Sequence, residues 1–402
     1  MRNGNLKVKN LLSPYTNYTF LLYLCIRKLE KMKYMWMMLF MVLPWVAIAY
    51  IAWHVWVLLP MSALWKSLII LVGLLCFAML FMNFGRKFDA YPLPVAQTAY
   101  EIGTSSIFVL LYLVIIFLVL DLGRLVRLVP RSLLYQNWQM ALGIFILLLG
   151  VFLYGNLHYY NKVRVPLEIK STKPLPKEYK VVMASDLHLG YHNPRKELAR
   201  WVDMINAEQP DFILIAGDII DGSMRPLKEE RMAEEFHRLQ APVYACLGNH
   251  EFYAGHPEAK QFYQDAGIHL LIDEAAVIDS AIVIIGRDDR TNMRRKPIKD
   301  LVESLNFQSS IFNLQYSIVL DHQPYNLDRA EAAGVDFQLS GHTHRGQVWP
   351  ISWITDHIYE CSWGPHQRGN TQFYVSSGLG IWGGKFRIGT QSEYVVATIT
   401  SK

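Results

Sequence analysis

The amino-acid sequence predicts an α-helical membrane part followed by a domain of the α/β class. The first 160 residues contain four long apolar stretches, whereas short β-rich runs alternate with helical patterns in the rest of the chain. A length of 402 residues leaves room for more than one domain. We therefore expect a membrane domain over residues 1–160, a linker over 161–178 and a second domain over 179–402.

Four stretches without Asp, Glu, Lys or Arg indicate the membrane-spanning helices. A bilayer core of ~30 Å requires about 20 apolar residues in a helix. Helices buried in a soluble protein are the alternative, but residues 64–84 have no polar face to present to water. The expected spans lie near residues 35–55, 65–84, 103–121 and 138–157.

Basic residues beside the spans predict the orientation in the membrane. Lys and Arg gather in the N-terminal region, in the second loop (Arg86 and Lys87) and after the fourth span. Because such residues favour the cytoplasmic side, we expect a multi-pass protein of the cell membrane with a cytoplasmic second domain. The third loop, with three arginines, is an exception that a surface-lying segment would explain. These flanks account for most of the net charge of +5, so nucleic acid is not an expected partner.

The second half of the chain reads as strands followed by helices. Residues 162–178 are basic and contain proline, which suits a linker or an opening edge strand. Apolar runs predict strands at 179–185, 211–217, 242–248, 281–286, 316–320, 336–340, 373–377 and 393–400. Helical patterns occupy 194–209, 226–239, 257–266, 297–305 and 326–333. This order predicts largely parallel sheets covered by helices.

Five of the predicted strands end in side chains that bind metals. Ligands of open α/β sheets bind beyond the carboxyl ends of the strands. Each short motif alone has an ordinary explanation, such as a turn, a helix cap or a buried histidine. Their joint occurrence at strand ends, with oxygen and imidazole donors but no cysteine motif, favours one or two ions of Mn, Fe, Zn or Mg. The residues are Asp186, His188, Asp218, Asp221, Asn249, His250, His322, His342 and His344.

The motif set resembles the calcineurin-like metallophosphoesterases. The motifs D-x-H, G-D-x-x-D, G-N-H-E, H-x-P and G-H-T-H occur in this order within residues 179–402. The resemblance implies a two-sheet β-sandwich flanked by helices, with two divalent metal ions. One ion would be held by Asp186, His188, Asp218 and His344, and the other by Asp218, Asn249, His322 and His342. His250 matches the family's catalytic histidine and Asp221 its orienting partner.

Two further segments are similar to the membrane-associated bacterial branch of that family. They are "GHTHRGQ" and "SSGLGIWGGKFRIG". The chain departs from the branch at Arg345, where glycine is usual, and at residues 391–393, where Pro-Pro-Glu is usual. These departures leave the metal-binding motifs intact but affect the expected substrate pocket. Arg345 and Arg387 are each either a phosphate ligand or a surface arginine, Glu251 is expected to be structural, and His192 to lie in an exposed loop.

The resemblance implies a membrane-anchored phosphoesterase. A metal-bridging hydroxide would hydrolyse a phosphodiester, phosphomonoester or pyrophosphate bond. Membrane lipids surround the spans, and the substrate could be lipid-linked, such as UDP-2,3-diacylglucosamine. A non-catalytic metal-binding membrane sensor or scaffold is the alternative. A transporter with a regulatory head is disfavoured, because the spans carry almost no charge. The sequence does not determine the oligomeric state.

Overall fold

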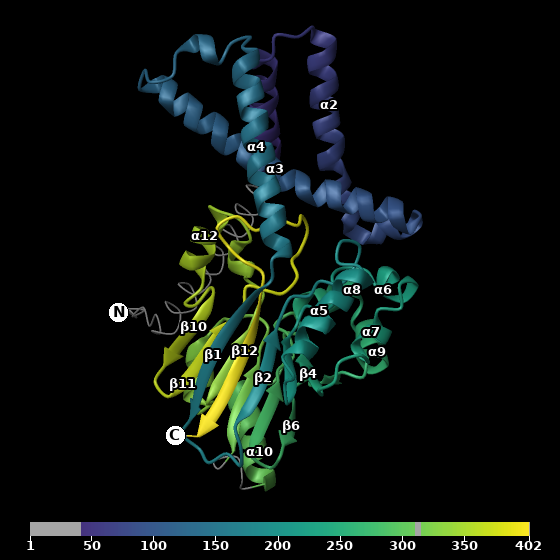
Figure 1. Cartoon of the computed structure of the whole chain (residues 1–402), viewed down its shortest axis with the longest axis vertical. Helices are drawn as coiled ribbons and strands as arrows, with labels where there is room; N and C mark the ends of the chain where they lie inside the picture. Colours follow the sequence, from purple (N-terminus) through teal and green to yellow (C-terminus); the bar gives the residue numbers. More distant parts are fainter. Residues whose placement is uncertain (1–41, 310–314, 402) are drawn as a thin grey trace, which may run out of the picture. The chain divides into compact units, whose positions relative to one another are not determined.

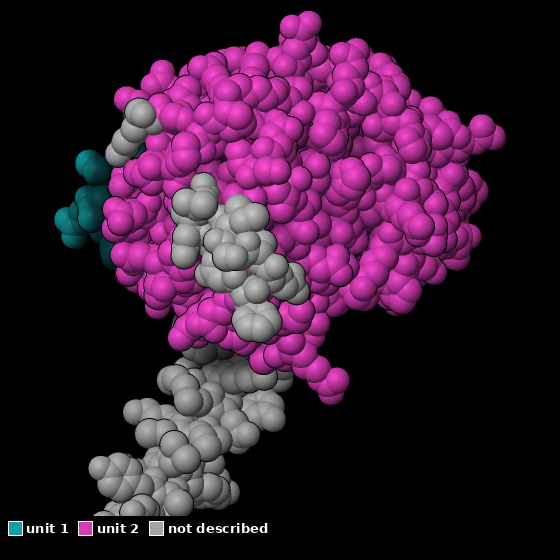
Figure 2. All heavy atoms as spheres, turned by 90° about the horizontal axis from the view of Figure 1, so that it is seen from below, with its two compact units in different colours: residues 1–70, 110–141 teal, residues 71–109, 142–402 magenta. Residues whose placement is uncertain are grey.

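The protein is described by a computed structural model that covers residues 42–309 and 315–401. The chain divides into two compact units (Figure 2). Unit 1 comprises residues 1–70 and 110–141, and unit 2 comprises residues 71–109 and 142–402. The basic N-terminal region and the first residues of the first predicted span lie outside the described residues.

Three described helices are long and apolar enough to cross a membrane. They cover Ala63–Asn83, Leu93–Leu125 and Trp138–Tyr160, and they confirm long apolar helices at the second, third and fourth predicted spans. Their labels in Figure 1 are α2 (Ala63–Leu80), α3 (Leu93–Leu125) and α4 (Trp138–Tyr160), and the 3-10 helix η1 (Phe81–Ala90) follows α2. The described part of the first predicted span is a shorter apolar helix, Val42–Leu58, so the expected count of four spans is approximate.

Two six-stranded sheets form the α/β part of unit 2 (Figure 1). In sheet order, the first contains β1 (Val163–Ser171), β12 (Glu393–Ser401), β2 (Tyr179–Ala184), β3 (Phe212–Ala216), β4 (Val243–Cys246) and β5 (His269–Leu270). The second contains β10 (Gly364–Arg368), β11 (Thr371–Val375), β9 (Phe337–Ser340), β8 (Tyr316–Leu320), β7 (Ile282–Gly286) and β6 (Glu274–Ile278). Strands β2 to β5 are parallel, and so are β7, β8, β9 and β11. The prediction of two largely parallel sheets is confirmed.

Alternating side chains of the strands build three apolar layers. On β2, Val181 and Met183 face the second sheet, whereas Val182 faces the helices on the outer side. The outer layer of the first sheet contains α5 (Arg195–Ala207) and α9 (His256–Asp265). The outer layer of the second contains α10 (Ile298–Ser309) and α11 (Leu327–Ala332). The result is a sandwich of two sheets with helices on both outer faces.

Some local predictions differ from the structure. The helix expected over residues 226–239 is wrong: α6 (Arg225–Glu229) and α7 (Ala233–Phe236) are separate, because Arg231 between them has φ 52°. Within the expected linker, residues 163–171 form β1, which pairs with β12 at the edge of the first sheet. The edge-strand interpretation is therefore confirmed, and the domain boundaries stay a prediction. The sequence did not predict α8 (Asn249–Ala254), α12 (Ile351–Ile358) or the 3-10 helix η4 (His344–Gly346).

Candidate metal centre

The predicted site residues follow the carboxyl ends of five strands, as expected. Strands β2, β3 and β4 of the first sheet end at residues 184, 216 and 246, and strands β8 and β9 of the second end at residues 320 and 340. Eight of the nine predicted side chains, all except Asn249, fall into three groups whose ligand atoms lie within 4.8 Å of one another. The two sheets therefore share one site at their strand ends.

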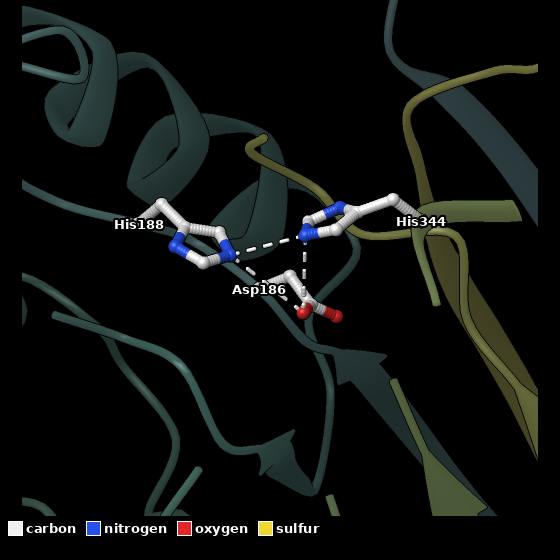
Figure 3. A group of neighbouring side chains, drawn as sticks. All are labelled: Asp186, His188 and His344. Carbon is white, nitrogen blue, oxygen red and sulfur yellow. Dashed lines mark hydrogen bonds and ion pairs between the residues drawn. The ribbon is translucent and has the colours of Figure 1, made fainter. Parts of the chain in front are cut away.

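The first group consists of Asp186, His188 and His344, and their side chains converge in Figure 3. Asp186 Oδ1 lies 3.5 Å from His344 Nε2 and 3.7 Å from His188 Nε2. The two imidazole nitrogens are 3.1 Å apart. One carboxylate oxygen and two ring nitrogens thus point at a common centre, as the ligands of a divalent ion do.

The second group consists of Asp218, His322 and His342. Asp218 Oδ2 lies 3.1 Å from His322 Nε2. The other ring nitrogen of His322, Nδ1, is 2.8 Å from the carbonyl oxygen of Ala216. This contact fixes Nδ1 as the donor and leaves Nε2 as the nitrogen that can bind a metal.

Asp218 also reaches the first group. Its Oδ2 atom lies 3.7 Å from His188 Nε2, in addition to its contact with His322. A single carboxylate oxygen is therefore within 4 Å of one imidazole of each group. Asp218 is the side chain in the described part of the chain that joins the two groups in this way.

The third group links Asp221 to two histidines. Asp221 Oδ1 lies 3.2 Å from His250 Nδ1 and 3.4 Å from His188 Nδ1. The other carboxylate oxygen accepts a hydrogen bond of 2.7 Å from the hydroxyl of Tyr100, a residue of α3. Sequence reasoning did not find Tyr100, because no motif connects a helix of the membrane part with a strand end.

The charge states of four of these groups suit a divalent ion. Burial lowers the pKa of His342 to about 4 and that of His344 to about 3, so both rings are neutral and offer a lone pair at neutral pH. Burial alone would raise the pKa of Asp186 and Asp218, but the surrounding histidines hold both below the ordinary value. Neutral imidazoles and ionised carboxylates are the protonation states that bind metals. Burial alone would lower the pKa of His188 and of His322, but the neighbouring carboxylates raise both above the ordinary value.

A buried amide oxygen supports the same conclusion. Asn249 is 7% exposed, and its Oδ1 atom has no hydrogen-bond partner among the described residues. Buried polar atoms without a partner are rare in folded proteins, so such an atom indicates a ligand. The residues present therefore fit divalent metal ions.

The backbone of the site is held in an uncommon conformation. Five site residues other than glycine have positive φ: Asp186 (54°), His188 (45°), Asp218 (52°), His342 (71°) and His344 (47°). Each costs on the order of 1–3 kcal/mol, and such strain gathers at functional sites. The neighbouring glycines of the motifs are needed for space. A Cβ atom at Gly248 would overlap the Asp218 carboxylate, and one at Gly341 would overlap that of Asp186.

Comparison with known proteins identifies the family. The model of the calcineurin-like phosphoesterases matches residues 179–346. A metallophosphoesterase of Aquifex aeolicus is 32% identical over 257 residues, which are 62% of this chain and 96% of that protein. The chain belongs to the calcineurin-like metallophosphoesterases. As the motifs predicted, this metallophosphoesterase is a metal-dependent phosphoric ester hydrolase.

Other relatives of the metallophosphoesterase include membrane proteins. A metallophosphoesterase of Campylobacter jejuni is 30% identical and covers 64% of this chain and 69% of its own. A transmembrane protein with a metallophosphoesterase domain from Danio rerio is 30% identical over 53% of this chain and 51% of its own. Among solved structures, a dimetal phosphatase from Danio rerio overlaps 50% of this chain and 87% of its own, with 14% identity and a TM-score of 0.33.

One of the two arginines of the metallophosphoesterase, Arg387, is placed differently from the alternatives that the sequence left open, whereas both alternatives stay open for the partly exposed Arg345. Arg387 is neither a surface residue nor a phosphate ligand, because it is fully buried and donates to backbone carbonyls that include those of Ser377 and His344. Its Nε atom donates to the hydroxyl of Ser392, one of the residues that depart from the family branch. Arg345 stacks on the ring of Trp363, 4.1 Å from its centre.

Two other expectations have clear outcomes. The structural role of Glu251 is confirmed, since its buried carboxylate accepts hydrogen bonds from the backbone N–H groups of Gly248, Asp218 and Ile220. The expectation that His192 is exposed is wrong. Its side chain is fully buried, contacts the carbonyl oxygen of Ile381 and stacks on Tyr100. A polar loop sequence gave no sign that a helix from the membrane part covers this position.

Proposed function

We propose that the protein is a membrane-anchored phosphoesterase that uses two divalent metal ions. The observation that carries the proposal is the position of Asp218, whose Oδ2 atom lies near His188 of one ligand group and His322 of the other. A shared carboxylate is the arrangement expected where two ions lie side by side. One ion would be held by Asp186, His188, Asp218 and His344, and the other by Asp218, Asn249, His322 and His342.

The bound ions would polarise the phosphoryl oxygens and make a water molecule a stronger nucleophile at neutral pH. The protein supplies the ligands in preorganised form. The neutral rings of His342 and His344 need not lose a proton before binding. The surrounding fold holds the strained backbone at Asp186 and Asp218.

His250 is the proposed proton donor to the leaving oxygen. Its Nδ1 atom is 3.2 Å from Asp221 Oδ1 and 3.1 Å from the carbonyl oxygen of Asp221. With Nδ1 donating to Asp221, Nε2 is left to face the substrate and to give up a proton as the ester bond breaks. The side chain of His250 is 15% exposed, more than those of Asp186, His188, Asp218, His322 and His344, so it lies at the mouth of the site.

Hydrolysis by the purified full-length protein tests the proposal. Bis-p-nitrophenyl phosphate and p-nitrophenyl phosphate would be assayed after chelation and after addition of Mn, Mg, Zn or Fe. We expect metal-dependent turnover that Asp218→Asn abolishes and that His250→Ala lowers. The loss in His250→Ala should be smaller than the about 10²- to 10⁴-fold of a general acid, because p-nitrophenolate leaves with little need of a proton. Unchanged activity in both folded variants would contradict the proposal. Bound metal without turnover on a broad substrate panel would favour the sensor or scaffold.

The proposed substrate is an amphipathic phosphate ester at the membrane surface, such as UDP-2,3-diacylglucosamine. Helix α12 begins seven residues after His344 and exposes Trp353, Ile354 and Ile358 by 65%, 57% and 57%. Just before α12, the backbone N–H of Trp349 donates a hydrogen bond of 2.7 Å to the carbonyl oxygen of Ile388. A Cβ atom added at Gly155, in the last turns of α4, would meet the Ile388 side chain. These contacts support a position of the exposed apolar side chains of α12 beside the carboxyl end of α4.

Matched substrates would test this substrate class. An acylated nucleotide sugar and its deacylated counterpart carry the same pyrophosphate, so any difference reports the acyl chains. We expect the acylated compound to be hydrolysed with a much higher kcat/KM. Equal values would leave the phosphoesterase intact and would exclude recognition of the lipid.

The catalytic domain is proposed to face the cytoplasm. The second loop contacts this domain, because Arg86 donates to the carbonyl oxygen of Ala254 and Asp89 accepts from the hydroxyl of Tyr191. The loop carries Arg86 and Lys87, and basic loops favour the cytoplasmic side. Labelling of an engineered surface cysteine with an impermeant reagent in intact cells tests the orientation. Labelling without permeabilisation would contradict it.

A further inference from the structure

The first turns of α3 lie on the catalytic part of unit 2. Helix α3 has 33 residues and is therefore about 50 Å long, whereas a bilayer core of ~30 Å needs about 20. The additional turns at the amino end of α3 make polar contacts with residues far along the chain. Gln97 donates to Glu230 at 2.9 Å, and Glu101 accepts from Lys385 at 2.9 Å. A membrane helix thus extends onto the surface that carries the site.

Tyr100 lies between these two contacts and points inward. The side chain is 1% exposed and packs in a cluster with Phe88 and Tyr191. Its ring stacks on that of His192, with centres 5.0 Å apart and planes 13° from parallel. Its hydroxyl donates to Asp221 Oδ2 at 2.7 Å.

The hydrogen bond of Tyr100 determines how the Asp221 carboxylate is turned. One oxygen, Oδ2, is held by Tyr100, and the other, Oδ1, is thereby directed at His250 and His188. A carboxylate with one anchored oxygen cannot rotate about its terminal bond without losing a charge-assisted hydrogen bond. Without the hydroxyl, the carboxylate would keep its charge but not its orientation toward His250.

We propose that Tyr100 is a positioning residue, through which a helix of the membrane part orients the Asp221–His250 pair. The proposal rests on the proposed function, because it assigns His250 the proton transfer described above. It gives the membrane part a role beyond anchoring, because activity then depends on the contact of Tyr100 in α3 with Asp221. Tyr100 contacts no metal ligand directly, but Asp221 Oδ1 also lies 3.4 Å from Nδ1 of His188, a ligand of the first group. The metal content of each variant is therefore measured, and rates are compared at full metal occupancy.

The test compares Tyr100→Phe with wild type in the full-length protein. Phenylalanine keeps the stacked ring and removes only the hydroxyl. Tyr191→Phe is the matched control, since it removes a buried hydroxyl of the same cluster that bonds to Asp89 and not to Asp221. The substrates are bis-p-nitrophenyl phosphate and diphenyl phosphate, whose leaving group is poorer and depends more on protonation.

We expect Tyr100→Phe to lower kcat on diphenyl phosphate by about 10- to 100-fold, as the loss of an orienting partner does. At full metal occupancy, the loss on bis-p-nitrophenyl phosphate should be smaller, and KM should stay unchanged. Tyr191→Phe should behave as wild type. Wild-type kinetics in Tyr100→Phe, or equal losses on both esters, would reduce Tyr100 to a packing residue and overturn the proposal.

A second measurement keeps the proposal separate from the proposed function. If wild type hydrolyses neither ester, the proposed function fails, but the orientation of His250 can still be measured. Its reaction with diethyl pyrocarbonate, located by mass spectrometry, should be several-fold faster in Tyr100→Phe than in Tyr191→Phe. The ring then keeps its contact with the carbonyl oxygen of Asp221 but loses the oriented carboxylate. Equal rates in the two variants would overturn the proposal.

Discussion

Replacement of Glu251 tests how the fold holds Asp218 in place. The side chain is fully buried, and each carboxylate oxygen accepts two hydrogen bonds. Oε2 accepts from the N–H groups of Gly248 (2.7 Å) and Asp218 (3.2 Å). Oε1 accepts from the N–H of Ile220 (3.0 Å) and from the hydroxyl of Tyr263 (3.0 Å). Glu251 therefore ties the turn after β3 to the turn after β4.

The substitution Glu251→Gln should lower stability by a predictable amount. The least costly orientation of the amide keeps oxygen at the Oε2 position and lets Tyr263 turn to accept from the new NH₂ group. The N–H of Ile220 is then left without an acceptor, which costs about 1–3 kcal/mol. Glu251→Ala leaves all three backbone N–H groups without acceptors and should cost about 3–9 kcal/mol at the same cost per group.

Thermal unfolding in detergent measures both changes. For a domain of this size about 1 kcal/mol corresponds to a Tm shift of about 2–4 °C. Glu303→Gln is the control, because Glu303 is exposed and its ion pair with Lys299 contributes little. Both Glu251 variants should unfold below the control, with alanine the lower. Equal Tm values for Glu251→Ala and Glu303→Gln would refute the reasoning.

Two further predictions concern other buried polar groups. Arg387→Lys should destabilise the protein by about 2–4 kcal/mol, since lysine cannot reach all of the carbonyl groups that Arg387 contacts. A raised KM at an unchanged Tm would contradict this prediction and would indicate that Arg387 binds a phosphate. His192 has its pKa lowered by burial from 6.5 to about 4. The unfolded chain therefore binds the proton more readily than the folded chain. The contribution of His192 to the free energy of unfolding is complete above about pH 6.5 and should be smaller by about 2 kcal/mol at about pH 5. His192→Gln should remove this part of the pH dependence in urea unfolding.

Much of the site could be predicted because its ligands follow strands with clear apolar patterns. Parallel strands bring their carboxyl ends to one edge, so Asp186 and Asp218 had to lie close together once β2 and β3 were recognised. The pairing of the two sheets is less accessible to sequence reasoning. Asp218 follows a strand of the first sheet and His322 follows a strand of the second, so their contact depends on how the two sheets pack. Only the motif resemblance predicted that contact.

Other features were missed because long-range packing determines them. The charge and flanking residues of Arg387 suit a surface position, yet surrounding carbonyl groups satisfy its donors in the interior. His192 reads as a loop residue, but Tyr100 of α3 covers it. The helix expected over residues 226–239 has helical periodicity, and a single left-handed residue, Arg231, divides it. None of these outcomes has a local signal in the sequence.

The metal content of the full-length protein tests the central claim most directly. After chelation and reloading with Mn or Zn, elemental analysis should find two ions per chain in wild type and in the control His237→Ala, whose ring is exposed and lies outside the three groups. Asp186→Ala and His342→Ala should each lose one ion, whereas Asp218→Ala should lose both. Retention of two ions by folded Asp218→Ala, or a single ion in wild type, would contradict a shared carboxylate between two metals.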